Sequence, residues 1–325
     1  MVRVAPHAAP LLAALDTIIF DVDGVLLDVS RSIRQVNCLV IPAYLNRLPD
    51  WTAPEDLLYS WEIELFKHAG GFNDDWDLSC ALALLYLFKA ARHGSRDAAL
   101  LHSLSPTLTE YTDNIAQRGG WLRNAERYLI GIATPDEKAR MYDAYDPALI
   151  HQLFQELWAG DLCPRLYGYE PQFYPGPGKC REDKPLLDRA LLPNLPLAIL
   201  TGRTRAEAEF ALELVGLSDR IPLPQNGMTR TEGNQKPDPD GLRRLVAQLG
   251  CKTALYIGDA VDDLRTVLHF RDLPESADVT VLSAQVLTGT AGSEAEPLFV
   301  EADILAPDVN AVLRLCLPRA SSATE

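Results

Sequence analysis

One stretch near the N-terminus, residues 17–30 with the sequence TIIFDVDGVLLDVS, constrains the fold and the chemistry of this chain most. Its first four residues are β-branched or aromatic, which predicts a short buried strand. Asp21 and Asp23 follow at the end of that strand. Because alternate side chains of an extended chain point to the same side, both carboxylates can reach one site. Gly24 then permits a sharp turn.

A solvated turn is the alternative interpretation of Asp21 and Asp23, because Asp-x-Asp-Gly is common in turns. The apolar residues on both sides, at 17–20 and 25–27, argue against it. Burying acids between apolar segments costs several kcal/mol unless a cation or hydrogen bonds compensate. The pattern therefore predicts a cation site at the carboxyl end of a strand, where open α/β sheets bind ligands.

The C-terminal part of the chain alternates short apolar runs with amphipathic segments. The runs predict further buried strands, and the segments between them predict helices. The strands are expected over residues 195–200, 254–257, 279–282 and 302–305, and the helices over 184–191, 205–215, 241–249 and 309–317. Strands that alternate with helices indicate a parallel, doubly wound sheet.

Polar residues follow these strands. Thr201, Gly202 and Arg203 come directly after one strand, and Thr204 with Glu207 forms a capping box at the start of the next helix. A hydroxyl and free backbone N–H groups at a helix N-terminus are suited to bind an anion.

Two further groups of polar residues follow the same pattern. Asp259, Asp262 and Asp263 follow the strand at 254–257, and Lys236 lies in the polar loop 226–240. Taken alone, Lys236 would usually be interpreted as a solvated charge. Taken alone, Thr201 could equally well be a helix cap.

The middle of the chain, residues 31–160, carries helical periodicity and little β signal. Helices are expected over 32–45, 54–68, 78–92, 106–117, 121–131, 135–145 and 147–158. A kink or break is expected at Pro42. The segment 78–92 is apolar nearly all round, which predicts the central helix of a bundle, and Asp75 or Asp77 is expected to cap it. Residues 162–182 are rich in Pro, Gly and Tyr and predict a linker.

The predicted fold class is therefore α/β: a Rossmann-like, doubly wound parallel sheet with an inserted all-helical cap domain. We expect the core to comprise residues 1–28 and 173–325, and the cap to comprise residues 29–172. A chain of 325 residues is long enough for two such domains.

Bulk composition excludes some classes of partner. The net charge of -15 argues against a nucleic-acid surface or an anionic membrane surface. The apolar patch at residues 8–14 is too short to cross a membrane. Six cysteines without a Cys-x-x-Cys pair indicate neither a zinc site nor a disulfide framework, so a reducing, cytoplasmic location is expected. The sequence carries no indication of an oligomeric state.

Four segments, taken in order, resemble the motifs of the haloacid dehalogenase (HAD) superfamily of phosphatases and phosphotransferases. FDVDGVLLD at 20–28 is similar to its first motif, LAILTGR at 197–203 to its second, Lys236 in QKPDPDGL to its third and IGDAVDD at 257–263 to its fourth. The chain resembles subfamily I of this superfamily, in its IA-like form. Members of this subfamily carry a helical cap in the insertion between the first two motifs. The segment YPGPG at 174–178 is similar to the one that returns the chain from cap to core.

This resemblance implies a magnesium-dependent phosphatase that acts on a small phosphorylated metabolite. Asp21 would be the nucleophile that forms an aspartyl-phosphate, and Asp23 would protonate the leaving oxygen and then activate water. Thr201 and the N–H of Gly202 would hold phosphoryl oxygens, and Lys236 would neutralise charge.

The resemblance also implies a metal site. Asp259 would bind Mg²⁺ directly, together with Asp21 and the backbone carbonyl of Asp23, and Asp263 would support the site. The family spacing favours Asp263 over its neighbour Asp262, for which a solvated turn acid is the alternative.

Three more residues are candidates for binding substrate. Arg203 lies near the predicted phosphate site, with an ordinary surface charge as the equal alternative. Arg34 and Asn73 are candidates in the cap, where substrates would be distinguished, although the Gly- and Asp-rich loop 70–76 is also typical of a plain turn between helices.

Two other functions compete with the phosphatase. A phosphomutase would use the same aspartyl-phosphate chemistry. A non-catalytic binding protein would retain only the fold, but the complete set of acids, Thr and Lys argues against this alternative. A dehalogenase is disfavoured because Asp23 supplies an acid and base that dehalogenation does not need.

Overall fold

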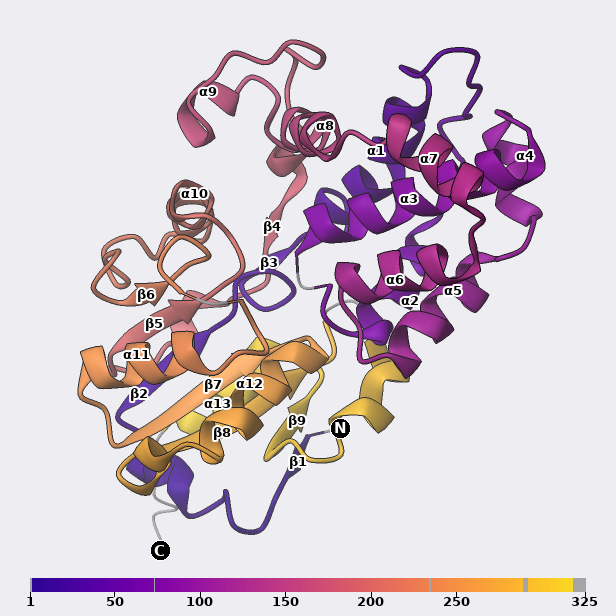
Figure 1. Ribbon diagram of the computed structural model, residues 1–325. Coiled ribbons are helices and arrows are strands. Elements are labelled where there is room, and N and C mark those ends of the chain that lie inside the picture. The colour runs from indigo at the N-terminus through magenta and orange to yellow at the C-terminus, as the bar shows by residue number, and fades with distance from the viewer. Residues whose placement is uncertain (1, 73, 234, 289–291, 318–325) are drawn as a thin grey trace, which may run out of the picture. The chain divides into compact units, whose positions relative to one another are not determined.

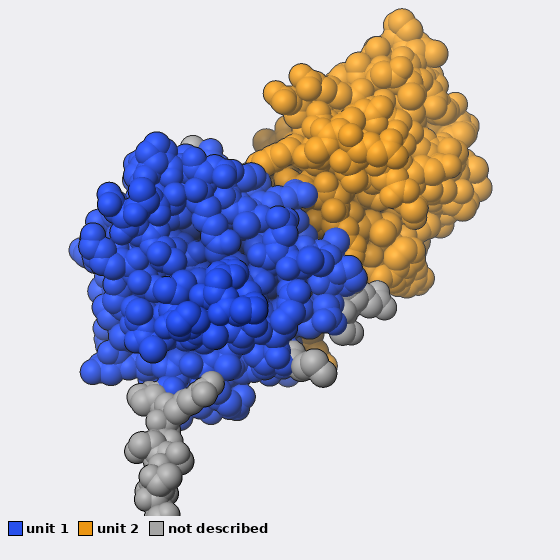
Figure 2. Space-filling view, turned by 90° about the horizontal axis from the view of Figure 1, so that it is seen from below, with its two compact units in different colours: residues 1–28, 184–325 blue, residues 29–183 orange. Residues whose placement is uncertain are grey.

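The chain divides into two compact units. The computed structural model describes residues 2–72, 74–233, 235–288 and 292–317. Unit 1 comprises residues 1–28 and 184–325, and unit 2 comprises residues 29–183 (Figures 1 and 2). None of the helices in the described part of the chain is long and apolar enough to cross a membrane.

Unit 1 is built on a seven-stranded sheet, counted over the described residues. The strand order is β1-β9-β8-β7-β2-β5-β6, and every neighbouring pair is parallel except β1 with β9. The strands are β1 (Arg3–Val4), β2 (Thr17–Phe20), β5 (Leu197–Leu200), β6 (Gly227–Met228), β7 (Thr253–Gly258), β8 (Thr280–Val286) and β9 (Ile304–Ala306). A separate antiparallel ribbon joins β3 (Leu27–Asp28) to β4 (Lys184–Pro185).

Strand β2 lies inside the sheet, between β7 and β5 (Figure 1). All four of its residues are buried, as expected for a β-branched and aromatic segment that is covered on both faces. Phe20 is opposite Ile199 on one side and Ile257 on the other. Because all three strands are parallel, the residues that follow them emerge at the same edge of the sheet.

Helices cover both faces of this sheet. They are α10 (Arg205–Val215), α11 (Asp240–Leu249), α12 (Val261–Arg271) and α13 (Val309–Cys316). Apolar side chains of α11 and α12 form one core cluster with residues of β2, β5 and β7. Figure 1 shows α11 and α12 in front of the sheet and α13 behind it. The predicted doubly wound α/β fold is thereby confirmed.

The start of α10 agrees with the sequence prediction, whereas the structure of residues 184–191 differs from it. The capping box of Thr204 and Glu207 starts α10 as expected. The helix predicted over 184–191 is wrong, because Lys184–Pro185 forms β4 and only the short 3-10 helix η3 (Arg189–Leu191) follows. Pro185 has no N–H to donate, and the next N–H, of Leu186, bonds the Leu26 carbonyl, so this segment runs extended beside β3.

Unit 2 is helical, and no strand occurs among its described residues. Its helices are α1 (Ile33–Leu45), α2 (Ser60–Ala69), α3 (Asp75–His93), α4 (Ala98–Ser103), α5 (Leu108–Gln117), α6 (Leu122–Ile132), α7 (Pro135–Asp143), α8 (Pro147–Ala159) and α9 (Cys163–Leu166). Helix α3 is buried along most of its length and contacts α1, α4, α6, α7 and α8. It is therefore the central helix of the bundle, as its apolar sequence predicted.

Two details of this unit differ from the sequence prediction. Helix α1 continues through Pro42 as one helix, so the predicted break does not occur. Helix α3 begins earlier than expected, and its cap is Asp74, whose side chain accepts a hydrogen bond from the N–H of Trp76. Asp75 and Asp77 thus lie inside the first turn, where acids also interact favourably with the helix dipole.

The segment from residue 173 to 183, which the sequence analysis assigned to the core, is part of unit 2. The buried carboxylate of Glu156 accepts hydrogen bonds from the backbone N–H groups of Phe173 and Tyr174. Gly178 lies so close to the end of α8 that a Cβ there would be 2.2 Å from the carbonyl carbon of Ala159. These contacts attach the segment to α8 of the helical unit.

Glu156→Ala is expected to destabilise unit 2 by about 1–3 kcal/mol, because it removes a buried charged acceptor and the hydrogen bonds that the N–H groups of Phe173 and Tyr174 donate to it. Chemical denaturation of the variant measures this loss. Glu55→Ala, which changes an exposed acid of the same unit, is the matched control and is expected to alter stability by less than about 0.5 kcal/mol. Equal stability of the two variants would contradict this account of the segment.

Candidate active site

Three carboxylates meet at the carboxyl edge of the sheet in unit 1. Asp21 follows β2, Asp259 follows β7, and Asp263 lies in the first turn of α12. One oxygen of each lies within 4.8 Å of the others, and all three residues are buried. The parallel pairing of β2 with β7 explains this convergence, because it places the loops after the two strands side by side.

Lys236 neutralises part of this charge. Its Nζ atom lies 2.9 Å from Oδ2 of Asp21 and 2.6 Å from Oδ1 of Asp263. Its side chain is 3% exposed, so the three groups form an ion cluster away from bulk water. The loop residue that in isolation resembled a solvated lysine is thus a buried cation.

Asp263 is held by four hydrogen bonds. Its Oδ1 atom accepts from Lys236 and from the hydroxyl of Tyr256 at 2.7 Å. Its Oδ2 atom accepts from the backbone N–H groups of Asp259 and Ala260 at 3.1 and 3.0 Å. With both oxygens engaged in this way, Asp263 orients Lys236 and the loop of Asp259.

Two residues of this arrangement were missed by the sequence analysis. Tyr256 donates to Asp263 from within β7, and Gly258 ends that strand. A Cβ at Gly258 would lie 2.3 Å from Cβ of Asp263, so only glycine leaves room for that side chain. The signal was available, because Tyr256 and Gly258 alternate along one face of a strand that ends beside the acids.

The turn after β5 lies at the same edge of the sheet. Thr201 is buried, and its hydroxyl oxygen accepts a hydrogen bond from the N–H of Arg203 at 3.2 Å. Thr204 is the residue that caps α10, so capping does not explain Thr201. Gly202 lies between these two residues and is half-buried.

Arg203 is not a surface charge. Its side chain is 4% exposed, and its guanidinium group contacts the carboxylate of Asp23, with Nη2 and Oδ1 2.6 Å apart. Arg203 therefore joins the loop after β2 to the turn after β5.

Burial perturbs the ionisable groups of this cluster. It raises the pKa of Asp21 to about 7, and the nearby carboxylates of Asp263 and Asp23 act in the same direction, whereas Lys236 opposes them. Burial alone would lower the pKa of Lys236, but the carboxylates of Asp21 and Asp263 raise it above its usual value. Lys236 is thus charged at neutral pH, and ionised Asp21 is costly without more positive charge.

The donor set fits a divalent cation. Oδ1 of Asp21 is buried and has no hydrogen-bond partner among the described residues. The site contains four carboxylates, those of Asp21, Asp23, Asp259 and Asp263, but only two cationic side chains, so it carries a formal charge of -2 when all are ionised. Hard oxygen donors with excess negative charge suit Mg²⁺.

The remaining predicted residues lie elsewhere. Asp262 is buried, with one oxygen 3.8 Å from Nη1 of Arg265, so it is not a solvated turn acid, and it does not belong to the carboxylate group. Arg34 lies on α1 of unit 2, where its Nε atom is 3.5 Å from Glu64. Asn73 lies outside the described residues.

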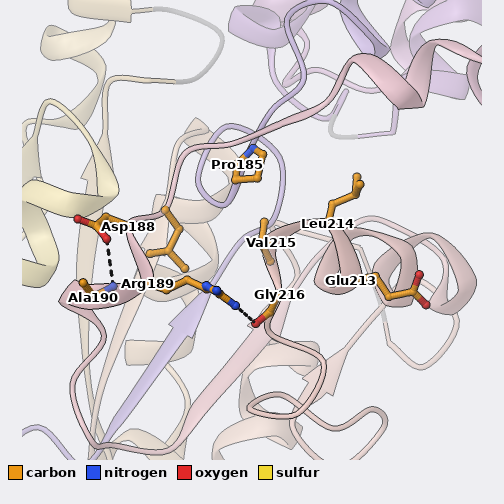
Figure 3. A pocket seen from close by; sticks show the side chains of 9 residues that line it. Pro185, Asp188, Arg189, Ala190, Glu213, Leu214, Val215 and Gly216 are labelled. Atoms are coloured by element: carbon orange, nitrogen blue, oxygen red, sulfur yellow. Dashed lines mark hydrogen bonds between the residues drawn. The ribbon is translucent and has the colours of Figure 1, made fainter.

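A surface hollow of about 590 Å³ also occurs in unit 1, between the segment after β4 and the C-terminal end of α10. Figure 3 shows the side chain of Arg189 extended toward Gly216, whose carbonyl oxygen accepts its hydrogen bond at 3.1 Å. The hollow contains none of the carboxylates described above. We therefore place the candidate active site at the ion cluster.

Comparison with known proteins shows the family of the chain and similar folds, independently of the site described above. The family model of haloacid dehalogenase-like hydrolases matches residues 15–268. The structure is similar to that of phosphatase Tt82 from Thermococcus thioreducens, with 23% identity, a TM-score of 0.56 and coverage of 92% of this chain and 97% of that one. It is also similar to a predicted phosphoglycolate phosphatase from Haemophilus somnus 129pt, with 13% identity, a TM-score of 0.50 and coverage of 93% and 98%. No curated protein sequence matches the chain.

The raised pKa of Asp21 has a consequence for stability. The folded protein binds this proton more tightly than the unfolded chain does. In metal-free buffer, the stability that Asp21 contributes is therefore present below its ordinary pKa of 3.8 and is lost as pH rises through about 7. Asp21→Asn removes the titration, so the variant should be more stable than the wild type at about pH 8, by roughly 1–2 kcal/mol, with little difference at about pH 4.5.

Urea unfolding in the presence of a chelator, at both pH values, measures this difference. Asp219→Asn, at an exposed position of the same unit, is the control and should change neither value. A destabilised Asp21→Asn variant at about pH 8 would show instead that attraction to Lys236 outweighs the cost of burial.

Proposed function

The chain belongs to the haloacid dehalogenase-like hydrolases, and from that premise we propose that it is a magnesium-dependent phosphatase of small phosphorylated metabolites. The observation that carries the proposal is the buried Oδ1 atom of Asp21, which has no partner among the described residues while Lys236 holds the other oxygen. A carboxylate held in this way, at the carboxyl end of a central strand, is a suitable nucleophile.

The proposed reaction has two steps. In the first, a carboxylate oxygen of Asp21 attacks phosphorus, the bond from phosphorus to the ester oxygen breaks, and Asp23 gives its proton to that oxygen. In the second, Asp23 takes a proton from water, the water oxygen attacks the aspartyl-phosphate, and the carboxylate of Asp21 is released with inorganic phosphate. The exposed fraction of Asp23, 32% of its side chain, suits a group that exchanges protons with water.

The other residues would stabilise charge. We propose that the hydroxyl of Thr201 and the N–H of Gly202 bind phosphoryl oxygens and that Lys236 neutralises the nucleophile and the phosphoryl group. Asp21, Asp259 and the backbone carbonyl of Asp23 would hold Mg²⁺, with Asp263 in support. When bound, the ion supplies positive charge that neutralises the phosphoryl group and the acids around it.

Selection among esters requires other residues, because donors that bind a phosphoryl group do not distinguish what is attached to it. We propose that residues of unit 2 make this distinction, with Arg34 and Asn73 as candidates. Arg34 belongs to a half-buried group of charged residues, and neither its Nε atom nor Oε2 of Glu64 has a hydrogen-bond partner among the described residues. Buried polar atoms without a hydrogen-bond partner are groups that a bound polar ligand would satisfy.

Activity is the direct test of this function. The purified protein is expected to release inorganic phosphate from members of a panel of phosphorylated metabolites. A chelator should abolish the release and added Mg²⁺ should restore it. Asp21→Asn should lower turnover on the order of 10³-fold or more, because the covalent step is lost, and mass spectrometry should find phosphate on Asp21 in the quenched wild type.

The alternatives give different results in the same assay. Conversion of a phosphorylated sugar to its isomer without release of phosphate would indicate a phosphomutase. Binding of a metabolite without turnover would indicate a binding protein. Full activity after exhaustive removal of metal, or a phosphate trapped on another residue, would contradict the roles proposed here.

Arg34→Ala is expected to lower kcat/KM for the preferred metabolite of the panel by roughly 2- to 10-fold, since a lost hydrogen bond costs about 0.5–1.5 kcal/mol. Hydrolysis of p-nitrophenyl phosphate should change much less. Arg31→Ala, at an exposed position near the start of the same helix, is the control and should affect neither substrate. Equal losses on both substrates would show that Arg34 serves the fold instead of selection.

A further inference from the structure

Among the described residues, one side chain holds the carboxylate of Asp23, that of Arg203. Nε of Arg203 donates to both oxygens of Asp23, at 3.0 and 3.3 Å, and Nη2 donates to Oδ1 at 2.6 Å. The Asp23 carboxylate has no other hydrogen-bond partner among the described residues. Because about a third of this side chain is exposed, packing restrains it less than it restrains Asp21.

Arg203 is itself held firmly. Its side chain is 4% exposed. Its backbone N–H donates to the hydroxyl oxygen of Thr201, and its carbonyl oxygen accepts from the N–H of Arg230 at 2.9 Å. A planar guanidinium that is anchored at its base and meets a carboxylate through two nitrogens restricts that carboxylate in distance and in plane.

We propose that Arg203 is a positioning residue that holds Asp23 in the orientation for proton transfer, and that it is not a ligand of the phosphoryl group. This inference rests on the proposed function of Asp23. It differs from the sequence prediction, which assigned Arg203 to substrate binding. The guanidinium lies against a carboxylate, and this pairing weakens its attraction for a phosphoryl group.

This arrangement connects two parts of the site. Thr201 and Arg203 belong to one turn, and the hydrogen bond between them fixes their relative positions. The residue proposed to hold the phosphoryl group and the residue that orients the proton carrier are therefore placed by the same backbone. The proton is delivered at a defined position relative to the bound oxygen atoms, which general acid and base catalysis requires.

The experiment compares Arg203→Met and Arg203→Lys, each in the wild-type and the Asp23→Asn background. Two esters are used, p-nitrophenyl phosphate, whose leaving group needs little protonation, and glycerol 2-phosphate, whose leaving group needs it strongly. Inhibition by inorganic phosphate reports binding of the phosphoryl group. Arg205→Met is the matched control, because Arg205 lies two residues away and pairs with Glu232.

We expect Arg203→Met to lower kcat on glycerol 2-phosphate by about 10- to 100-fold, as for a catalytic group displaced by about 1 Å, and to have a smaller effect on p-nitrophenyl phosphate. KM and the inhibition constant of phosphate should stay within about twofold. Arg203→Lys should retain part of the activity. In the Asp23→Asn background the same changes should have little further effect, because the group that Arg203 positions is already lost.

Three results would overturn the inference. Arg203 would be a phosphate ligand if the losses in kcat caused by Arg203→Met and Asp23→Asn multiplied in the variant that carries both changes. The same conclusion would follow if the inhibition constant for phosphate rose about tenfold or more. Equal losses on the two esters, with a melting temperature lowered in both variants, would leave it a structural role only. A wild type that releases phosphate from no ester would reject the proposed function and this inference together, whereas the other results reject the inference alone.

Discussion

The contact of Lys236 with two buried carboxylates is the interaction on which the site depends. Parallel pairing of β2 with β7 brings the loops that carry Asp21 and Asp259 to one edge of the sheet, so the fold itself creates a concentration of negative charge. Without a buried cation this charge would cost several kcal/mol for each ion. Lys236 offsets part of that cost, and the site remains negative enough to attract a divalent cation.

Lys236 in turn depends on Asp263 and on the end of β7. Asp263 orients the ammonium group only because its other hydrogen bonds, to Tyr256 and to two backbone N–H groups, prevent it from turning. Those N–H groups, of Asp259 and Ala260, are available because both residues precede α12, which begins at Val261, so no hydrogen bond within the helix uses them. The interval between Gly258 and Asp263 in the sequence is therefore a geometric requirement: the glycine makes space for a side chain that returns over it from the helix.

The sequence predicted the parts of the structure that local patterns determine. The strand 17–20, the capping box at Thr204 and the central bundle helix were all predicted from patterns within a few residues. The errors have a different origin. The helix expected over residues 184–191 does not form there. The segment is extended because the N–H of Leu186 bonds the carbonyl of Leu26, and no local pattern reveals a contact between positions so far apart in the chain. The two-residue strands β1 and β6 are too short to carry any period. The pairing of Arg203 with Asp23 spans 180 residues and has no local sign.

Asp21 and Asp23 show how one loop can place the same residue type in two different environments. They are two positions apart, yet the side chain of Asp21 is 6% exposed beside a buried ammonium, whereas that of Asp23 is 32% exposed beside a guanidinium. A nucleophile gains from exclusion of water and from a fixed direction of attack, whereas a group that carries protons must exchange them with water. Contrasting environments of this kind, more than the identity of the residues, assign separate roles to neighbouring carboxylates. The alternation along the strand placed both acids at the site, and their partners from two other loops made them different.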